Sequence, residues 1–166
     1  MTTYITVFIA VFVAIMAREL KISEFRQAWI NSLRDEISEF TSKAHEWMQL
    51  YLDFNGADQD AKEETYPKLN TLKYDSYRLL RKIQMRFHPD DIAGNKLLAS
   101  LEDLLDPAKP AADPINLKGD NRYSAWRTLA DQAIVEARQL LKEEWETTKN
   151  PWRRIWRKLL SMRRQR

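Results

Sequence analysis

A stretch without charge opens the chain, and apolar residues at helical spacing follow it directly. Residues 1–17 are rich in Ile, Val, Phe and Ala and contain no charged side chain. From Ile22 to Phe54 the apolar residues recur every three or four positions, which is the period of one helix face. No proline or glycine interrupts residues 1–55, so the pattern predicts one continuous helix. Its expected inner face comprises Ile22, Phe25, Trp29, Leu33, Ile37, Phe40, Ala44, Trp47, Tyr51 and Phe54.

Three further helices are predicted downstream. Asn55-Gly56 and the acidic run to Glu64 indicate a loop, after which a helix begins near Pro67 and stops before Pro89. A shorter helix over 92–105 and a last one over about 122–148 flank a proline-containing loop at 106–121. Their expected inner residues are Leu69, Leu72, Leu79, Leu80, Ile83 and Phe87, then Ile92, Leu97, Leu98, Leu101, Leu104 and Leu105, and then Trp126, Leu129, Ala133, Ile134, Ala137, Leu140, Leu141 and Trp145. The predicted fold is all-α, with an antiparallel bundle of about four helices over residues 21–148. The heptad-like spacing from Leu33 onward suits either this bundle or an oligomer.

Residues 1–20 are expected to form a transmembrane anchor. A helix of 17 residues is about 25 Å long, and Arg18 and Lys21 can extend to the headgroups to match a hydrocarbon core of about 30 Å. A signal peptide fits less well, because no basic residue precedes the apolar run. Basic residues follow the span only, which predicts an inner-membrane protein of a bacterium with its N-terminus outside and its C-terminus cytoplasmic. The small-residue stripe of the span is Thr6, Ala10 and Ala14, at a spacing that permits close packing of helices in lipid.

The last segment, residues 149–166, contains eight basic residues and no acid, whereas residues 1–148 are net acidic. Asn150-Pro151 restarts the chain into a predicted amphipathic helix. Trp152, Ile155, Trp156, Leu159 and Leu160 share one face, and Arg153, Arg154, Arg157, Lys158 and Arg164 lie largely on the other. This composition is typical of a helix on an anionic leaflet. Packing on the bundle and binding of nucleic acid are the alternatives.

Side chains suited to catalysis are sparse. The chain has no cysteine, so it has no disulfide and no thiolate nucleophile or ligand. The two histidines, His45 and His88, are far apart in sequence and lack the companions of a metal site or a catalytic triad. No glycine-rich phosphate loop occurs. We therefore expect no enzyme activity, no cofactor and no bound metal.

A basic and aromatic face on the helix near residues 70–86 is the candidate ligand site. Guanidinium groups pair with phosphates, and neighbouring tyrosines stack on bases, so this face suits a nucleotide or a single-stranded oligonucleotide. A solvated charged face is the alternative. The candidate residues are Tyr74, Tyr77, Arg78, Arg81, Lys82 and Arg86.

The stretch YRLLRKIQMRFHPDD, residues 77–91, resembles helix II and the His-Pro-Asp loop of J-domain co-chaperones. That resemblance implies that His88, Pro89 and Asp90 engage an Hsp70 partner. It is confined to this stretch, and the short helix motif that precedes it in that family is missing. A J-domain-like function is therefore the weaker alternative.

The run LKISEFRQAWINSLRDEISEF after the anchor resembles small single-pass proteins of bacterial phage-defence loci, with the layout of Hailong-type membrane effectors. The resemblance covers mainly residues 4–40. It implies an antiviral effector that oligomerises and perturbs the membrane, as a pore or by depolarisation, under control of its cytoplasmic helices and of a DNA oligomer. A membrane-tethered scaffold or adaptor that holds a protein partner, without conduction, is the main alternative.

Overall fold

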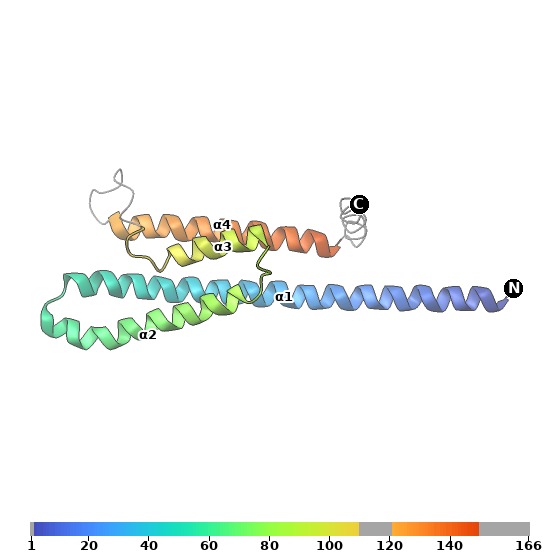
Figure 1. Ribbon diagram of the computed structural model, residues 1–166, viewed down its shortest axis with the longest axis horizontal. Helices are drawn as coiled ribbons and strands as arrows, with labels where there is room; N and C mark the ends of the chain where they lie inside the picture. The colour runs from blue at the N-terminus through green and yellow to red at the C-terminus, as the bar shows by residue number, and fades with distance from the viewer. Residues whose placement is uncertain (1, 110–120, 150–166) are drawn as a thin grey trace. The chain divides into compact units, whose positions relative to one another are not determined.

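Four α-helices make up the secondary structure of the described residues, which contain no strand (Figure 1). The computed structural model describes the backbone of residues 2–109 and 121–149, and the side chains of these residues except 2–6, 8, 11, 121–124 and 147–149. The helices are α1 (Thr2–Gly56), α2 (Gln59–Gln84), α3 (Ile92–Asp103) and α4 (Asn121–Lys149). The all-α prediction is therefore confirmed. The helix predicted over 149–166 and most of the loop predicted over 106–121 lie outside the described residues.

The chain divides into two compact units. One unit is Leu33–Leu140, and the other combines Met1–Ser32 with Leu141–Arg166. Helix α1 contributes its first half to one unit and its second half to the other.

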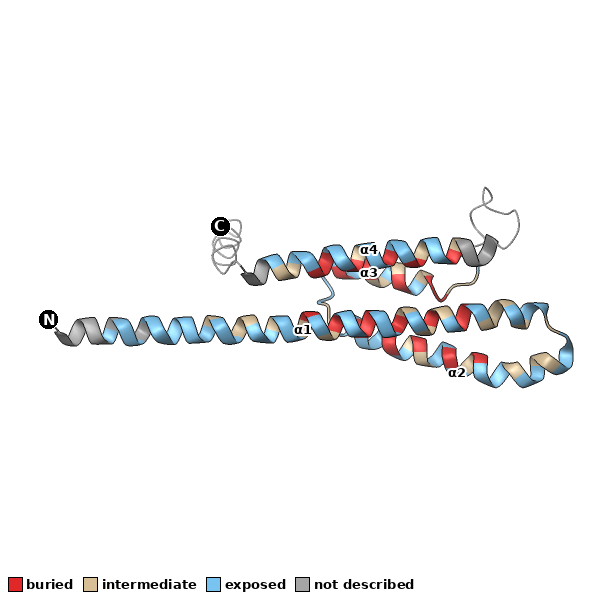
Figure 2. Ribbon diagram, turned by 180° about the vertical axis from the view of Figure 1, so that it is seen from behind, coloured by how far each residue is buried: buried red, intermediate tan, exposed pale blue. Residues whose placement is uncertain are grey.

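Apolar side chains from all four helices form the core of the Leu33–Leu140 unit. The heptad-like seam of α1 supplies one wall: Leu33, Phe40 and Ala44 are fully buried, and Tyr51 and Phe54 are half-buried. Figure 2 shows buried positions concentrated in this second half of α1, whereas its first half is mostly exposed. The other buried apolar residues of this unit are Ile37, Trp47, Met48, Leu69, Leu72, Leu79, Leu80, Ile83, Leu97, Leu101, Leu104, Leu105, Trp126, Ala130, Ala133, Ala137 and Leu140. A helical bundle is thus confirmed for this part of the chain.

Helices α3 and α4 are joined by a small number of directional contacts. The buried indole Nε1 of Trp126 donates to the carbonyl of Leu104 at 3.0 Å. The same indole makes an edge-to-face contact with the His45 ring of α1, with 5.3 Å between the ring centroids. Glu136 of α4 accepts from the Ser100 hydroxyl at 2.6 Å and pairs with Lys96 of α3 at 3.0 Å. These contacts satisfy polar groups that α3 and α4 would otherwise leave unpaired at their interface.

The loop predicted between α1 and α2 is much shorter than expected. Helix α1 continues through Gly56, and α2 already begins at Gln59, so Pro67 lies inside the helix and does not start it. The Asp58 carboxylate caps α2 by accepting from the backbone N–H of Ala61 at 3.0 Å. The acidic run that suggested a loop therefore forms the first turns of α2, where negative charge is favourable beside the helix N-terminus.

Three residues predicted on inner faces are exposed. Phe25 is 72 % exposed, because the inner face of α1 passes through Ile30 and the half-buried Arg26 at this point. Ile92 is 86 % exposed, as the first residue of α3, directly after its cap. Ile134 is 39 % exposed and borders the row of small residues by which α4 is buried. In each case the apolar periodicity predicted the helix correctly, but it assigned a residue at the edge of the buried face to the interior.

The membrane anchor predicted over residues 1–20 lies within α1. Among the described residues, no helix combines the length and the apolar character needed to cross a membrane.

Gly94 is expected to be required where the loop before α3 turns back on α2. A Cβ added to Gly94 would meet Phe87 Cδ1 at 2.5 Å and Asp91 Oδ2 at 3.0 Å. Gly94→Ala should therefore lower the free energy of unfolding by about 1–3 kcal/mol. In a Phe87→Ala background the same substitution should be neutral, or stabilising by up to about 1 kcal/mol through helix propensity. Chemical denaturation followed by circular dichroism measures the double-mutant cycle.

Gly56→Ala is the matched control, since an added Cβ there meets nothing within 4 Å. It should leave the unfolding free energy almost unchanged. An equal loss for Gly94→Ala with and without the Phe87 ring would contradict the proposed contact.

Candidate functional site

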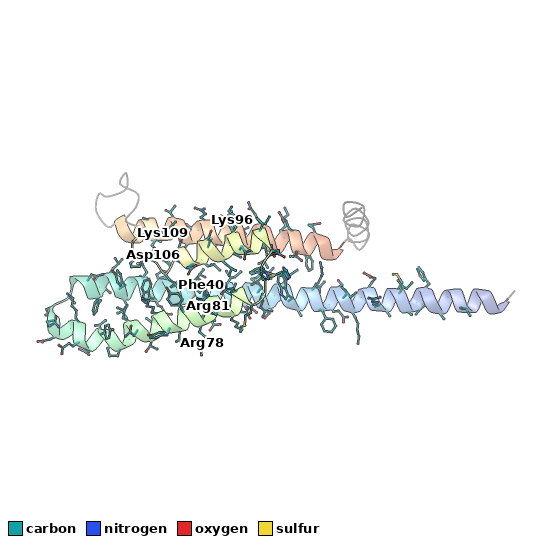
Figure 3. All side chains as sticks on the ribbon, viewed as in Figure 1. Phe40, Arg78, Arg81, Lys96, Asp106 and Lys109 are labelled. Carbon is teal, nitrogen blue, oxygen red and sulfur yellow. The ribbon has the colours of Figure 1, made fainter. Side chains whose placement is uncertain are left out.

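The predicted basic and aromatic face is divided by the structure into an outer and an inner part. On the outer part, Tyr74 is 71 % exposed and the side chain of Arg78 is 77 % exposed, and Arg81 is also exposed. Figure 3 labels Arg78 and Arg81 on α2. Positions 74, 78 and 81 follow one another at helical spacing, so the three side chains form one row on the solvent side of α2. Tyr77 is half-buried beside this row.

The outer arginines, Arg78 and Arg81, form polar contacts with neighbouring residues of the same helix. Arg78 pairs with Asp75 one turn earlier at 3.6 Å, and Arg81 donates to the Gln84 side chain at 2.7 Å. Exposed pairs of this kind contribute little to stability and exchange readily with solvent or a ligand. The row of Tyr74, Arg78 and Arg81 therefore remains accessible to an anion that also offers a planar ring.

Lys82 and Arg86 point instead at a buried carboxylate on α1. Glu36 has a side chain that is only 4 % exposed. Arg86 donates two hydrogen bonds to this carboxylate, from Nε to Oε2 at 2.6 Å and from Nη2 to Oε1. Lys82 Nζ lies 3.1 Å from Oε1. A carboxylate held by a two-nitrogen guanidinium contact is fixed in orientation as well as in charge. These two predicted ligand residues thus fasten α2 to α1.

The ion cluster of Glu36, Lys82 and Arg86 shifts the titration of its members. The hydrogen bond from Arg86 lowers the pKa of Glu36, burial opposes this by raising it, and the Lys82 contact lowers it further. The same hydrogen bond raises the pKa of Arg86. Glu36 is therefore ionised at neutral pH in the folded protein, and its negative charge lies between two cations of α2 that would otherwise repel each other more strongly.

The His-Pro-Asp tripeptide of residues 88–90 lies in the connection between α2 and α3. His88 and Asp90 are exposed, with Nδ1 of His88 3.4 Å from Asp90 Oδ2. The carbonyl of Pro89 accepts from the Asn95 side chain at 2.6 Å, and Asp91 caps α3 through the N–H of Gly94. These hydrogen bonds and the cap order the tripeptide while its side chains stay accessible.

Apolar side chains surround the N-terminal part of α1 on every side. Their exposed fractions run from 49 % to 58 % between residues 7 and 16, and successive residues step by about 100° around the helix axis. Ala10 and Ala14 are exposed as well, and the Thr6 side chain lies outside the described residues. The exposed large side chains of this part are Val7, Ile9, Phe12, Val13, Ile15 and Met16.

The end of this apolar part is marked by charge and by a contact with α4. Arg18 and Lys21, which were predicted at the membrane interface, are exposed. Arg26 Nη1 lies 3.6 Å from Glu144 Oε2 on α4, within the unit that joins Met1–Ser32 and Leu141–Arg166. The four other residues predicted at the membrane interface, Trp152, Arg153, Trp156 and Arg157, lie outside the described residues.

One charged residue that matters here, Glu36, was not predicted from the sequence. Glu36 occupies a polar-looking position beside the seam residue Ile37, and nothing local marks it as buried. Glu36 and Arg86 are far apart along the chain, so no local sequence pattern indicates that they form an ion pair. The signal that was available is the position of Glu36, which lies three positions after Leu33 and four before Phe40 and therefore falls on the same broad helix face.

The described residues contain no group of three or more His, Cys, Asp or Glu side chains that is able to hold a metal ion. The described arrangement offers an exposed row of one tyrosine and two arginines on α2 and exposed apolar side chains along the first part of α1.

Replacing Glu36 should weaken the α1–α2 contact. At pH 7, Glu36→Gln is expected to lower the free energy of unfolding by about 2 kcal/mol, because it removes the negative charge that Arg86 and Lys82 face and replaces one acceptor oxygen by a donor NH2 group. The lowered pKa adds stability above the ordinary pKa of glutamate, about 4.3, and this contribution is lost as the pH falls below that value toward the lower folded pKa. The difference between wild type and variant should therefore shrink on acidification. Denaturant titrations at a series of pH values measure it.

Glu39→Gln is the matched control, an exposed carboxylate on the same helix. It should change the unfolding free energy by less than about 0.5 kcal/mol at any pH. A variant at Glu36 as stable as this control at pH 7 would contradict the role of the cluster.

Comparisons of the chain with protein-family models, with curated proteins and with solved structures find no match.

Proposed function

We propose that the protein is a membrane effector of bacterial antiviral defence that enters the inner membrane through the first part of α1. In this proposal the anchors of several copies associate and depolarise the membrane. The helical unit Leu33–Leu140 controls the assembly. The observation that carries the proposal is the ring of exposed apolar side chains between residues 7 and 16.

A helix that is apolar on every side is unfavourable in water. Each buried Å² of apolar surface is worth about 25 cal/mol, so a ring of half-exposed Ile, Val and Phe side chains forgoes several kcal/mol in solution. Transfer of these side chains from water into lipid recovers that free energy. A lipid environment also requires that the backbone hydrogen bonds be satisfied internally, as they are in an α-helix. Exposed Arg18 and Lys21 then fall where the helix leaves the hydrocarbon, and they favour a cytoplasmic location for all that follows.

Association of anchors is supported by Ala10 and Ala14, which are exposed one turn apart on α1. Small side chains at this spacing let two helix backbones approach closely in lipid, where no hydrophobic effect drives helices together. The predicted third member of the stripe, Thr6, continues the spacing by one more turn. The heptad-like seam of α1 does not serve the oligomer in this proposal, because Leu33, Ile37 and Phe40 are already buried within one chain.

Control of the assembly is assigned to the outer row of α2. Tyr74, Arg78 and Arg81 offer two guanidinium groups and a ring to a nucleotide or a short single strand. A ligand shifts an equilibrium between assembled and closed forms only by its difference in affinity for the two. The Glu36 cluster supports such a coupling, since it joins α2 to the helix that continues into the anchor.

A tether without conduction is the second candidate, and one observation favours it. Residues 7–17 contain only apolar side chains, so this part of the anchor offers no polar group to a water-filled path. A tethered scaffold would hold a partner at the inner leaflet and leave the membrane intact. The same experiment separates the two functions.

The test of the proposal is the membrane potential of cells induced for the full chain. We expect depolarisation that disappears when residues 1–17 are deleted, and that also disappears for an anchor of the same composition in scrambled order. The scrambled anchor keeps hydrophobicity and length while it breaks the Ala10–Ala14 spacing, so it is the matched control for insertion alone. A potential-sensitive dye, with protein levels checked in the membrane fraction, gives the readout.

A well-expressed full chain that is found in membranes and leaves the potential unchanged would refute the effector and support the tether. A full chain that remains outside the membrane fraction would refute both.

The ligand row is tested by binding of a labelled single-stranded DNA oligonucleotide to the purified full chain. Arg78→Glu with Arg81→Glu should weaken binding by about tenfold or more, and the salt dependence of the remaining binding should be shallower. Arg127→Glu with Arg138→Glu makes the same charge change at two exposed positions of α4 and should cost much less. Equal losses in the two double variants would show a general charge effect and sink the site assignment.

A further inference from the structure

The solvent side of α2 carries acidic residues near its start and basic residues near its end. Six exposed residues follow one another there at intervals of three, four or seven positions, so they share one face of the helix. Figure 3 labels Arg78 and Arg81 at the basic end of this face. Its members, which we call the outer face of α2, are Asp60, Glu63, Pro67, Tyr74, Arg78 and Arg81.

The charges on the outer face are arranged symmetrically about its centre. Asp60 and Arg81 lie equally far from the midpoint between positions 70 and 71. Glu63 and Arg78 lie equally far from the same midpoint. Reversal of the helix direction about this point therefore exchanges each acid of the outer face with an arginine.

A face with this symmetry is complementary to itself. In a two-fold dimer, residue i of one copy contacts residue j of the other, and j contacts i. Two copies of α2 that meet in antiparallel orientation at the midpoint therefore place each acid opposite an arginine. A parallel pair would place like charges opposite each other, which is unfavourable.

The two uncharged members of the outer face fit the same arrangement. Pro67 and Tyr74 are also equally far from the midpoint, so the proline of one copy lies opposite the tyrosine of the other. Tyr74 is 71 % exposed within one chain, and a tyrosine ring contributes a large apolar area when a partner covers it. The charged and the uncharged residues thus select one register.

We propose that two copies of the chain associate through the outer face of α2, in antiparallel orientation and with the two-fold axis between positions 70 and 71. The occupant is a second copy, because both halves of the complementary charge pattern are present on one helix face. Residues 60–81 span about 32 Å of helix, and a strip about 10 Å wide buries about 600 Å² over the two copies. This area is typical of a weak and reversible contact.

The contact uses the arginines that the proposed function assigns to an anionic ligand. A second copy and the ligand therefore exclude each other from Arg78 and Arg81. This exclusion rests on the proposed function, whereas the pairing itself requires neither the ligand nor the anchor.

The register is tested by crosslinking of the full chain in detergent solution with a short bis-maleimide, since the chain contains no native cysteine. Thr71→Cys should form a covalent dimer, because this exposed position lies beside the two-fold axis. Arg78→Cys should not crosslink with itself, since its two copies lie about 22 Å apart along the antiparallel pair. A mixture of Glu63→Cys and Arg78→Cys chains should give the mixed dimer. Arg127→Cys, at an exposed position of α4, is the control for random collision.

Charge reversal tests whether the ion pairs select this register. In the Thr71→Cys background, Arg78→Glu with Arg81→Glu should lower the crosslinking yield by about fivefold or more, and so should Asp60→Arg with Glu63→Arg. The chain with all four changes is again complementary to itself and should regain the yield. An equimolar mixture of the two double variants should also regain it, as a mixed dimer. Arg127→Glu with Arg138→Glu is the matched control and should leave the yield unchanged.

Three results would overturn the pairing. They are a Thr71→Cys yield no higher than that of Arg127→Cys, self-crosslinking of Arg78→Cys as strong as that of Thr71→Cys, and a failure of the four changes together to regain the yield.

Binding of a labelled single-stranded DNA oligonucleotide separates this inference from the proposed function. The crosslinked Thr71→Cys dimer should bind the oligonucleotide more weakly than the same chain before crosslinking. A chain that binds the oligonucleotide through Arg78 and Arg81 but gives no Thr71→Cys dimer would refute the pairing alone. A chain that gives the dimer but binds no oligonucleotide in either form would refute only the ligand row.

Discussion

Helix α1 contributes residues to both units of the chain, and its two parts expose different kinds of side chain. Its first part exposes apolar side chains on every side, and its second part buries one stripe and exposes polar residues elsewhere. The backbone is the same in both, because an α-helix satisfies its own hydrogen bonds in water and in lipid. Within the Leu33–Leu140 unit, α2 contacts the second part of α1 through Arg86 and Glu36. Within the other unit, the end of α4 contacts the first part of α1 through Glu144 and Arg26.

The buried charge of Glu36 makes the α1–α2 contact specific. Apolar residues such as Phe40 and Ile83 supply most of the burial, but an apolar stripe alone permits sliding by a turn. A carboxylate that is 4 % exposed permits no such shift, because it would leave Arg86 and lose its compensation. Burial of the Glu36 charge costs free energy, but it restricts the packing of α2 on α1 to a single register. The same cluster removes Arg86 from the ligand row and leaves Arg78 and Arg81 to face solvent.

Periodicity was sufficient to predict the four helices and most of the core, since apolar spacing reflects burial directly. The seam from Leu33 to Trp47 was correct in the Leu33–Leu140 unit. Residue type was an ambiguous guide where the same kind of side chain is compatible with two structural roles. Acidic residues near Asp58 suggested a loop and instead begin α2. Arg86 was predicted as a ligand residue, and the structure shows that it binds Glu36. Long-range ion pairs leave no local pattern, so the division of the basic face required the structure.

Helix α4 returns antiparallel to the first part of α1 and ends beside its charged residues. Glu144 pairs with Arg26, and α4 ends at Lys149, five residues later, which is about 7.5 Å further along the helix axis. In an antiparallel pair this end reaches the level of Lys21, so α4 stops at the charged residues of α1. The exposed apolar side chains between residues 7 and 16 therefore lie beyond the end of α4 and stay uncovered by it.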